Sequence, residues 1–137
     1  MNFVLAPRLE QDSYFLTSLS LSEVRLHKNA AFPWLILIPR RANMVEIIDL
    51  NDEDQNQLLK EIRLTSHILK NYYQPQKLNI ANLGNIVSQL HIHIIARFET
   101  DKAWPQPIWC TVHNAEYSQD EKSNLLAHFV KEFKRIQ

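Results

Sequence analysis

The sequence predicts an α+β fold built on an antiparallel sheet, and three observations lead to this prediction. Two short segments in the first third of the chain and two more before residue 100 have the patterns of β-strands. An amphipathic helical pattern follows each pair, so the expected order of elements is β-β-α-β-β-α. The links within each pair are of hairpin length, which favours antiparallel neighbours.

The first pair of predicted strands lies between residues 22 and 38. Residues 22–27 alternate between apolar and polar side chains, with Val24 and Leu26 on the apolar face, which is typical of a half-buried strand. Residues 34–38 are apolar at every position and predict a strand covered on both faces, which Pro39 ends. The twenty N-terminal residues have a weaker pattern, from which we expect a short helix around Leu9 to Phe15.

A long helix is predicted between Asn51, which can cap its N-terminus, and Pro75, which stops it. Acidic residues at positions 52–54 lie in its first turn, where the helix dipole favours negative charge. Its apolar stripe is expected to consist of Leu58, Ile62, Thr65, Leu69 and Tyr72, with Leu59 and Ile68 beside it.

The second strand pair and the last helix complete the predicted fold. Residues 78–81 and 90–96 form the strands, which are joined through Gly84 and Asn85. The last helix opens at the capping box Ser118-x-x-Glu121. Its buried stripe is expected to consist of Leu125, Phe129, Val130, Phe133 and Ile136.

Length and composition exclude several functional classes. The 137 residues suffice for one domain, and we expect a single domain over residues 1–137. Fifteen basic residues balance fifteen acidic ones, so the basic excess of a nucleic-acid-binding protein is absent. The single glycine, Gly84, excludes Walker and Rossmann phosphate loops, and the single cysteine, Cys110, excludes a disulfide framework. The longest fully apolar run is too short to cross a membrane and no targeting segment is evident, so we expect a cytoplasmic protein without a membrane partner.

Two histidines on one predicted strand form the chemical centre of the sequence. Strand alternation places Gln89, His91 and His93 on one face and the intervening apolar residues on the other. A neutral imidazole carries a lone pair that can attack phosphorus, and a second imidazole can donate a hydrogen bond to a phosphate oxygen or a leaving group. The spacing alone leaves three interpretations open: a solvated polar face, a metal-binding pair, or covalent and acid–base catalysis.

The residues around this pair resemble a known family. The run Gln-Leu-His-Ile-His-Ile-Ile at residues 89–95 resembles the histidine triad (HIT) signature, His-φ-His-φ-His-φ-φ with φ apolar, and residues 35–40 resemble the family's apolar strand ending in Pro and a basic residue. Residues 101–109 resemble a bacterial subgroup of HIT hydrolases with Gln at the first triad position, related by name to diadenosine polyphosphate hydrolases. The resemblance implies a HIT-like antiparallel sheet of about five strands, with a long central helix and a C-terminal helix.

The resemblance also implies an activity and its residues. It implies cleavage of a nucleoside monophosphate from a phosphoramidate or dinucleoside polyphosphate through a nucleotidyl-histidine intermediate, with no cofactor and with the protein as a homodimer. His91 would be the nucleophile, and His93 would contact the phosphate or the leaving group. Gln89 replaces the first triad histidine, but its main-chain carbonyl can still orient the His91 ring. For the nucleotide, the resemblance implies that Asn29 contacts the ribose and that either Asn79 or Asn82 supplies a polar contact at the end of a strand. The phosphate loop would consist of Gly84, Asn85 and Ile86.

Two departures from the family pattern keep other functions open. Gln89 lacks the imidazole of the first triad position, and Ile86 lacks the hydroxyl of the usual phosphate-loop Ser or Thr. One alternative is therefore a nucleotide-binding module with little turnover. The other is a cupin-like metal protein, which is a poor match because cupins use glycine-rich turns.

Overall fold

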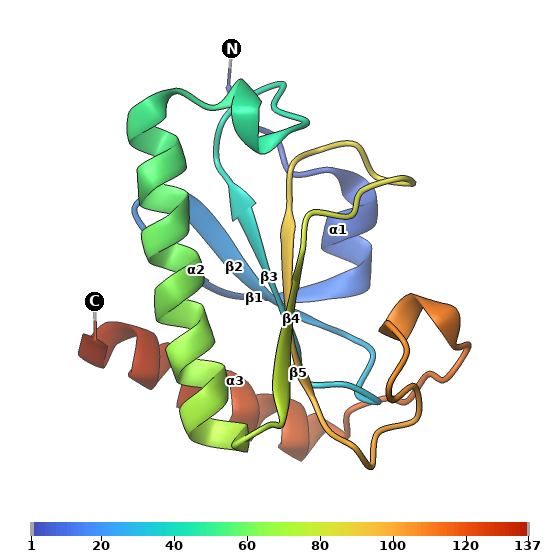
Figure 1. The fold of residues 1–137 in the computed structure, drawn as a ribbon. Helices are drawn as coiled ribbons and strands as arrows, with labels where there is room; N and C mark the ends of the chain where they lie inside the picture. The colour runs from blue at the N-terminus through green and yellow to red at the C-terminus, as the bar shows by residue number, and fades with distance from the viewer. Residues whose placement is uncertain (1, 137) are drawn as a thin grey trace.

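The protein folds around one five-stranded antiparallel sheet with the strand order β1-β2-β3-β5-β4 (Figure 1). The structure is a computed structural model and describes residues 2–136. The strands are β1 (Ser13–Ser18), β2 (Ser22–His27), β3 (Trp34–Pro39), β4 (Lys77–Ala81) and β5 (Ile92–Arg97). The helices are α1 (Pro7–Asp12), α2 (Asp52–Tyr73) and α3 (Gln119–Ile136), with 3-10 turns η1 (Ile47–Asp49) and η2 (Ile108–Cys110). The predicted α+β class, the two hairpins and both long helices are confirmed.

The two faces of the sheet have different covers. Figure 1 shows α2 and α3 against one face, and α1 and the segment after β5 against the other. Strand β3 serves both faces, because Leu35 and Leu37 join the core under α2 and α3 while Trp34, Ile36 and Ile38 join the second core. All six of its residues are buried, as the unbroken apolar run predicts. The second face carries the candidate site described below.

Both long helices begin at the predicted caps. The Asn51 side chain accepts a hydrogen bond from the Asp54 amide of α2, and Ser118 and Glu121 exchange the two hydrogen bonds of a capping box at α3. Leu59 differs from expectation and is 66% exposed, because one residue step turns it about 100° away from the buried Leu58. No helix within residues 2–136 combines the length and apolar character needed to cross a membrane.

The N-terminal region differs most from expectation. The expected helix from Leu9 to Phe15 is in fact α1, which ends at Asp12, and the chain continues directly as the edge strand β1. A bulge between Phe15 and Thr17 shifts the pairing of β1 with β2. Since a bulge interrupts the alternation of faces, β1 has no continuous period of two to recognise.

Arg97, at the end of β5, anchors the segment that follows the sheet. Its side chain is 2% exposed and forms an ion pair with Asp101 at 2.8 Å, with further hydrogen bonds to Asn79 and to the Gln106 carbonyl. Asp101 in turn accepts hydrogen bonds from three amides of its own loop. These bonds fix the loop to the end of the sheet. The next element, η2, carries Trp109 to the candidate site. Arg97 therefore serves the architecture and does not face a phosphate or open solvent.

Candidate active site

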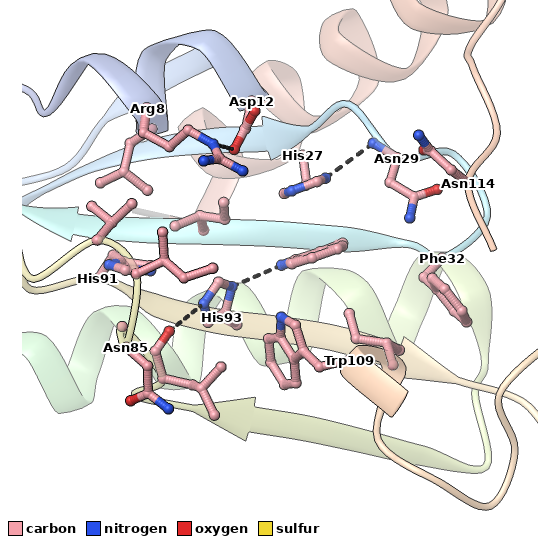
Figure 2. A pocket seen from close by; sticks show the side chains of 18 of the residues that line it. Arg8, Asp12, His27, Asn29, Phe32, Asn85, His91, His93, Trp109 and Asn114 are labelled. Atoms are coloured by element: carbon pink, nitrogen blue, oxygen red, sulfur yellow. Dashed lines mark hydrogen bonds and ion pairs between the residues drawn. The ribbon is translucent and has the colours of Figure 1, made fainter. Parts of the chain in front are cut away.

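A cavity of about 630 Å³ opens on the sheet face opposite α2 and α3 (Figure 2). It is bounded by α1, by β2, β3 and β5, by the loop between β4 and β5, and by the segment after β5. Four histidines line it, together with polar groups able to contact an anion or a sugar and two indole rings: His27, His91, His93, His113, Arg8, Asn29, Asn85, Asn114, Trp34 and Trp109. Polar and aromatic side chains thus converge on one concave surface, which is typical of a small-molecule site.

The ring of His91 is oriented by the chain beside it. Its Nδ1 lies 2.6 Å from the main-chain oxygen of Gln89, so Nδ1 carries the proton and donates it. In the neutral ring, Nε2 therefore keeps a free lone pair. The residue is only 4% exposed, yet it lines the cavity. Burial lowers the pKa of His91 below its usual 6.5, although the hydrogen bond to Gln89 opposes this shift, so the neutral form is favoured.

His93 lies beside His91, with ring centroids 4.8 Å apart, but both of its nitrogens are engaged. Trp34 Nε1 donates to His93 Nδ1 at 3.0 Å, and His93 Nε2 donates to the Leu83 carbonyl at 3.1 Å (Figure 2). Burial, with the neighbouring His91 second, lowers the pKa of His93 to about 4. His93 is therefore a neutral ring with a fixed tautomer.

The amide of Gln89 turns away from the two imidazoles. Its Oε1 accepts from the Ala6 amide and its Nε2 donates to the Val4 carbonyl, each at 2.8 Å. The side chain is not among those that line the cavity. The expected row of two imidazoles and an amide is thus split: the Gln89 carbonyl orients His91, whereas its side chain fastens the N-terminal segment.

The nucleotide-contact candidates separate into two groups. Asn29, Gly84, Asn85 and Ile86 line the cavity, whereas the strand-end candidates Asn79 and Asn82 do not. The Asn79 side chain instead accepts a hydrogen bond from Arg97. Asn29 binds the backbone of residues 113–115 through both its oxygen and its nitrogen, which holds that segment at the cavity.

Sequence reasoning missed part of the cavity wall. Trp34 was expected only as a residue of a buried strand, but its indole lines the site and binds His93. His27 lies flat on Trp34, with ring centroids 3.6 Å apart and an interplanar angle of 2°. The one usable signal was position: His27 ends β2 and Trp34 begins β3, so an antiparallel hairpin brings them together. Nothing in the local sequence pattern predicts that Arg8 and Asn114 line the cavity.

The histidine pair does not offer the ligands of a metal centre. A two-histidine metal site needs a free nitrogen from each ring, and here His91 offers Nε2 whereas His93 is hydrogen-bonded at both nitrogens. Within residues 2–136, no three His, Cys, Asp or Glu side chains are grouped so that they could hold an ion. The donor set therefore fits the cupin-like alternative poorly.

Comparison with known proteins places this geometry in a family. A family model described as HIT domain matches residues 8–100. The chain belongs to the HIT family. No curated protein matches this HIT protein.

Solved structures agree with this assignment. A histidine triad protein from Bradyrhizobium japonicum is 42% identical, with a TM-score of 0.94 over 96% of this chain and 98% of that chain. One from Sinorhizobium meliloti is 38% identical, with a TM-score of 0.91 over 95% and 96%. One from Marinobacter aquaeolei is 33% identical, with a TM-score of 0.95 over the full length of both. The HIT-like fold is therefore shown along essentially the whole chain.

Gly84 allows the loop between β4 and β5 to lie close against His91, and its replacement should disable the site. A Cβ on Gly84 would lie 2.5 Å from the Val87 carbonyl oxygen and 3.2 Å from His91 Cε1. Gly84→Ala must therefore shift the loop and crowd the edge of the His91 ring next to Nε2. We expect kcat/KM for nucleotide cleavage to fall by about 10²-fold, because small displacements of reacting groups have effects of that size.

The control for Gly84→Ala is Ser88→Ala, since Ser88 is exposed on the same loop and does not line the cavity. Steady-state kinetics of both variants should show the loss in Gly84→Ala alone. Wild-type kcat/KM in Gly84→Ala would show that the close approach of this loop has no role in turnover.

Proposed function

We propose that this HIT protein is a nucleotidyl hydrolase or transferase that acts at the α-phosphorus of a nucleotide through a covalent intermediate on His91. One observation carries the proposal: the bond from His91 Nδ1 to the Gln89 carbonyl leaves Nε2 with a free lone pair beside the cavity. An imidazole held in this tautomer needs no base to activate it. The substrate classes are dinucleoside polyphosphates and nucleoside phosphoramidates.

The chemistry divides into two displacements. His91 Nε2 attacks the α-phosphorus, a P–N bond forms, and the bond to the leaving group breaks with its electron pair on the leaving group. Water or another acceptor then attacks the phosphorus, the P–N bond returns its electron pair to Nε2, and the acceptor loses a proton. Throughout both steps the Gln89 carbonyl can stabilise the positive charge that develops on the ring, because it accepts the Nδ1 proton.

The remaining groups of the cavity suit the rest of a nucleotide. Arg8 is a cation at the cavity for phosphate oxygens, although it also pairs with Asp12. The Asn29 side-chain amide donates one of its two protons to the His113 carbonyl, so the other proton can be donated to a ribose hydroxyl. The loop at Gly84, Asn85 and Ile86 lies over the histidine pair and is the proposed phosphate loop. We further propose that residues 1–137 form a single domain, that the protein belongs to the HIT subgroup with Gln at the first triad position, and that it acts as a homodimer in the cytoplasm.

Rapid-quench mass spectrometry tests the proposal. Wild-type protein mixed with diadenosine triphosphate should gain the mass of one adenylate on His91 within the first turnover, with or without a chelator. His91→Ala should gain none, whereas His67→Ala, which removes an exposed imidazole from α2, should behave as wild type. Tight adenosine nucleotide binding without an adduct or turnover would select the binding-module alternative. An adduct that persists in His91→Ala would reject His91 as the nucleophile.

The pH dependence of the first half-reaction follows from the state of His91. Its pKa lies below the usual 6.5 because burial disfavours the charged ring. The neutral nucleophile therefore predominates at pH 6.5 and is lost only at lower pH. We expect the midpoint of the acidic limb of kcat/KM to lie below pH 6.5. Stopped-flow profiles between pH 4 and pH 8 would measure it, and a limb centred above pH 6.5 would contradict the assignment.

A further inference from the structure

Three aromatic rings form a connected row across the cavity face of the sheet. His27 on β2 lies flat on Trp34 of β3, and Trp34 Nε1 donates to His93 on β5. The pairing of Leu26 with Leu35 in the antiparallel register places His27 beside Trp34, while His93 lies opposite Ile36 two residues further along β3. Figure 2 labels His27 and His93, the two histidines of this row, with His91 beside His93. The row therefore links two of the cavity histidines, His27 and His93, through Trp34.

Each of the two histidines presents an unprotonated nitrogen to an N–H group. His93 Nδ1 accepts from Trp34 Nε1, and His27 Nδ1 accepts from the Asn29 amide, both at 3.0 Å. Neither donor can become an acceptor. Protonation of either Nδ1 would set two N–H groups against each other and break the bond. Burial acts in the same direction, because it lowers the pKa of both rings to about 4.

We infer that this site has no imidazolium to protonate a leaving group, and that it therefore takes nucleotide substrates whose leaving group departs as a stable anion. This inference rests on the proposed function and narrows its substrates to phosphoanhydrides and esters of acidic hydroxyls, with alkylamine phosphoramidates excluded as good substrates. Trp34 is the positioning residue, since its Nε1–H fixes the tautomer of His93. His93 contributes at most a neutral N–H hydrogen bond through Nε2.

The proton balance shows why the leaving group decides the rate. When the bond from phosphorus to a polyphosphate or an acidic phenol breaks, the oxygen keeps the electron pair and is stable as the anion. When the bond to an alkylamine breaks, the nitrogen needs a proton as it departs. An acid that supplies this proton is worth about 10²–10⁴-fold in rate. A site without such an acid therefore cleaves amine substrates more slowly by that factor, whereas substrates with an anionic leaving group are not slowed.

Three of the other charged or titratable groups at the cavity, Arg8, Asp12 and His91, are already engaged and do not supply this acid. Arg8 Nε donates to Asp12 Oδ2 at 2.8 Å, so these two side chains are engaged with each other in an ion pair. His91 has donated its Nδ1 proton to a carbonyl bond and uses Nε2 for attack. His113 lies exposed at the cavity and is the single further imidazole of its lining, so the test below includes it.

Two esters of AMP, with 4-nitrophenol and with unsubstituted phenol, measure the requirement for an acid. They differ in the acidity of the leaving group and share the nucleotide. We expect the wild-type kcat/KM to be about 10²-fold or more higher for the nitrophenyl ester, as for a reaction without acid catalysis. Trp34→Phe keeps a ring for His27 to stack on and removes the donor to His93. Because His93 Nδ1 can then take a proton, the ratio should shrink by about tenfold or more.

Trp109→Phe is the matched control for Trp34→Phe. The Trp109 ring contacts both Trp34 and His93 edge to face, but it donates no hydrogen bond to either. It should keep the wild-type ratio of the two esters even if both rates fall. His113→Asn should also keep that ratio, and a steeper ratio in this variant would identify His113 as an acid and overturn the inference.

The tautomers can be read without turnover. In ¹⁵N NMR of the labelled wild-type protein, His93 Nδ1 and His27 Nδ1 should have the shifts of unprotonated ring nitrogens at pH 7, and His93 should titrate at a higher pH in Trp34→Phe than in the wild type. If the wild-type kcat/KM values for the two esters differed by less than about threefold, or if His93 Nδ1 were protonated at pH 7, the inference would be overturned. The proposed function would still stand if the adduct on His91 were observed. Absence of both the adduct and ester turnover would overturn the proposed function itself, and the inference with it.

Discussion

His91→Gly should lose nucleotidyl transfer almost completely and regain part of it when free imidazole is added. The variant removes the cavity imidazole whose Nδ1 donates to the Gln89 carbonyl and whose Nε2 therefore keeps a free lone pair, while that carbonyl stays in place. Loss of the nucleophile in a covalent mechanism costs on the order of 10⁶ in kcat. We expect a fall of several orders of magnitude with diadenosine triphosphate, measured by chromatography of released AMP.

Rescue by imidazole would identify the missing group chemically. Free imidazole can enter the space left by the side chain and attack the α-phosphorus, so the product should be the adenosine 5′-phosphorimidazolide in place of AMP. His67→Ala, which lacks an exposed imidazole on α2, should release AMP at the wild-type rate and give no imidazolide. Turnover by His91→Gly within about tenfold of wild type would contradict the role of His91.

The local sequence pattern predicted those parts of the fold that depend on residues adjacent in the sequence. The caps at Asn51 and Ser118, the buried strand 34–38 and the hairpin links each follow from a few adjacent side chains, and the structure confirms them. Strand β1 escaped prediction because its bulge breaks the alternation that marks a strand. The edge position of β1 weakened the signal further, since Phe15 is 54% exposed there.

The histidine pair could be found from the sequence, but its chemical state could not. The state of His93 depends on Trp34, which lies 59 residues earlier, and the side-chain contacts of Gln89 are with residues 83 and 85 positions away. Contacts of this range are set by strand order and by the course of the N-terminal segment. The Gln89 carbonyl, in contrast, is a local contact two residues from His91, so its role follows from any residue at that position.

Arg97→Met should cause the largest loss of stability among the ion-pair residues. Arg97 and Asp101 have side chains that are 2% and 7% exposed, so removing the cation leaves a carboxylate buried without its partner. Breaking such a pair costs about 3–5 kcal/mol. Denaturant unfolding would measure the change. The control is Arg135→Met, because Arg135 and Glu132 are 60% and 24% exposed and an exposed pair contributes about 0–1 kcal/mol.

The same pair predicts how the stability difference depends on pH. Burial raises the pKa of Asp101, but hydrogen bonds from Arg97 and from the Phe98 and Ala103 amides outweigh it and bring the value to about 2, below the ordinary 3.8. A carboxyl with a lowered pKa stabilises the fold above pH 3.8 and loses that contribution as the pH falls towards 2. The gap in unfolding free energy between wild type and Arg97→Met should therefore narrow below pH 3.8, since the wild type alone loses the pair. A gap that stays constant from pH 7 to pH 2 would show that Arg97 stabilises the loop through packing on Phe32 and Trp104 and not through its charge.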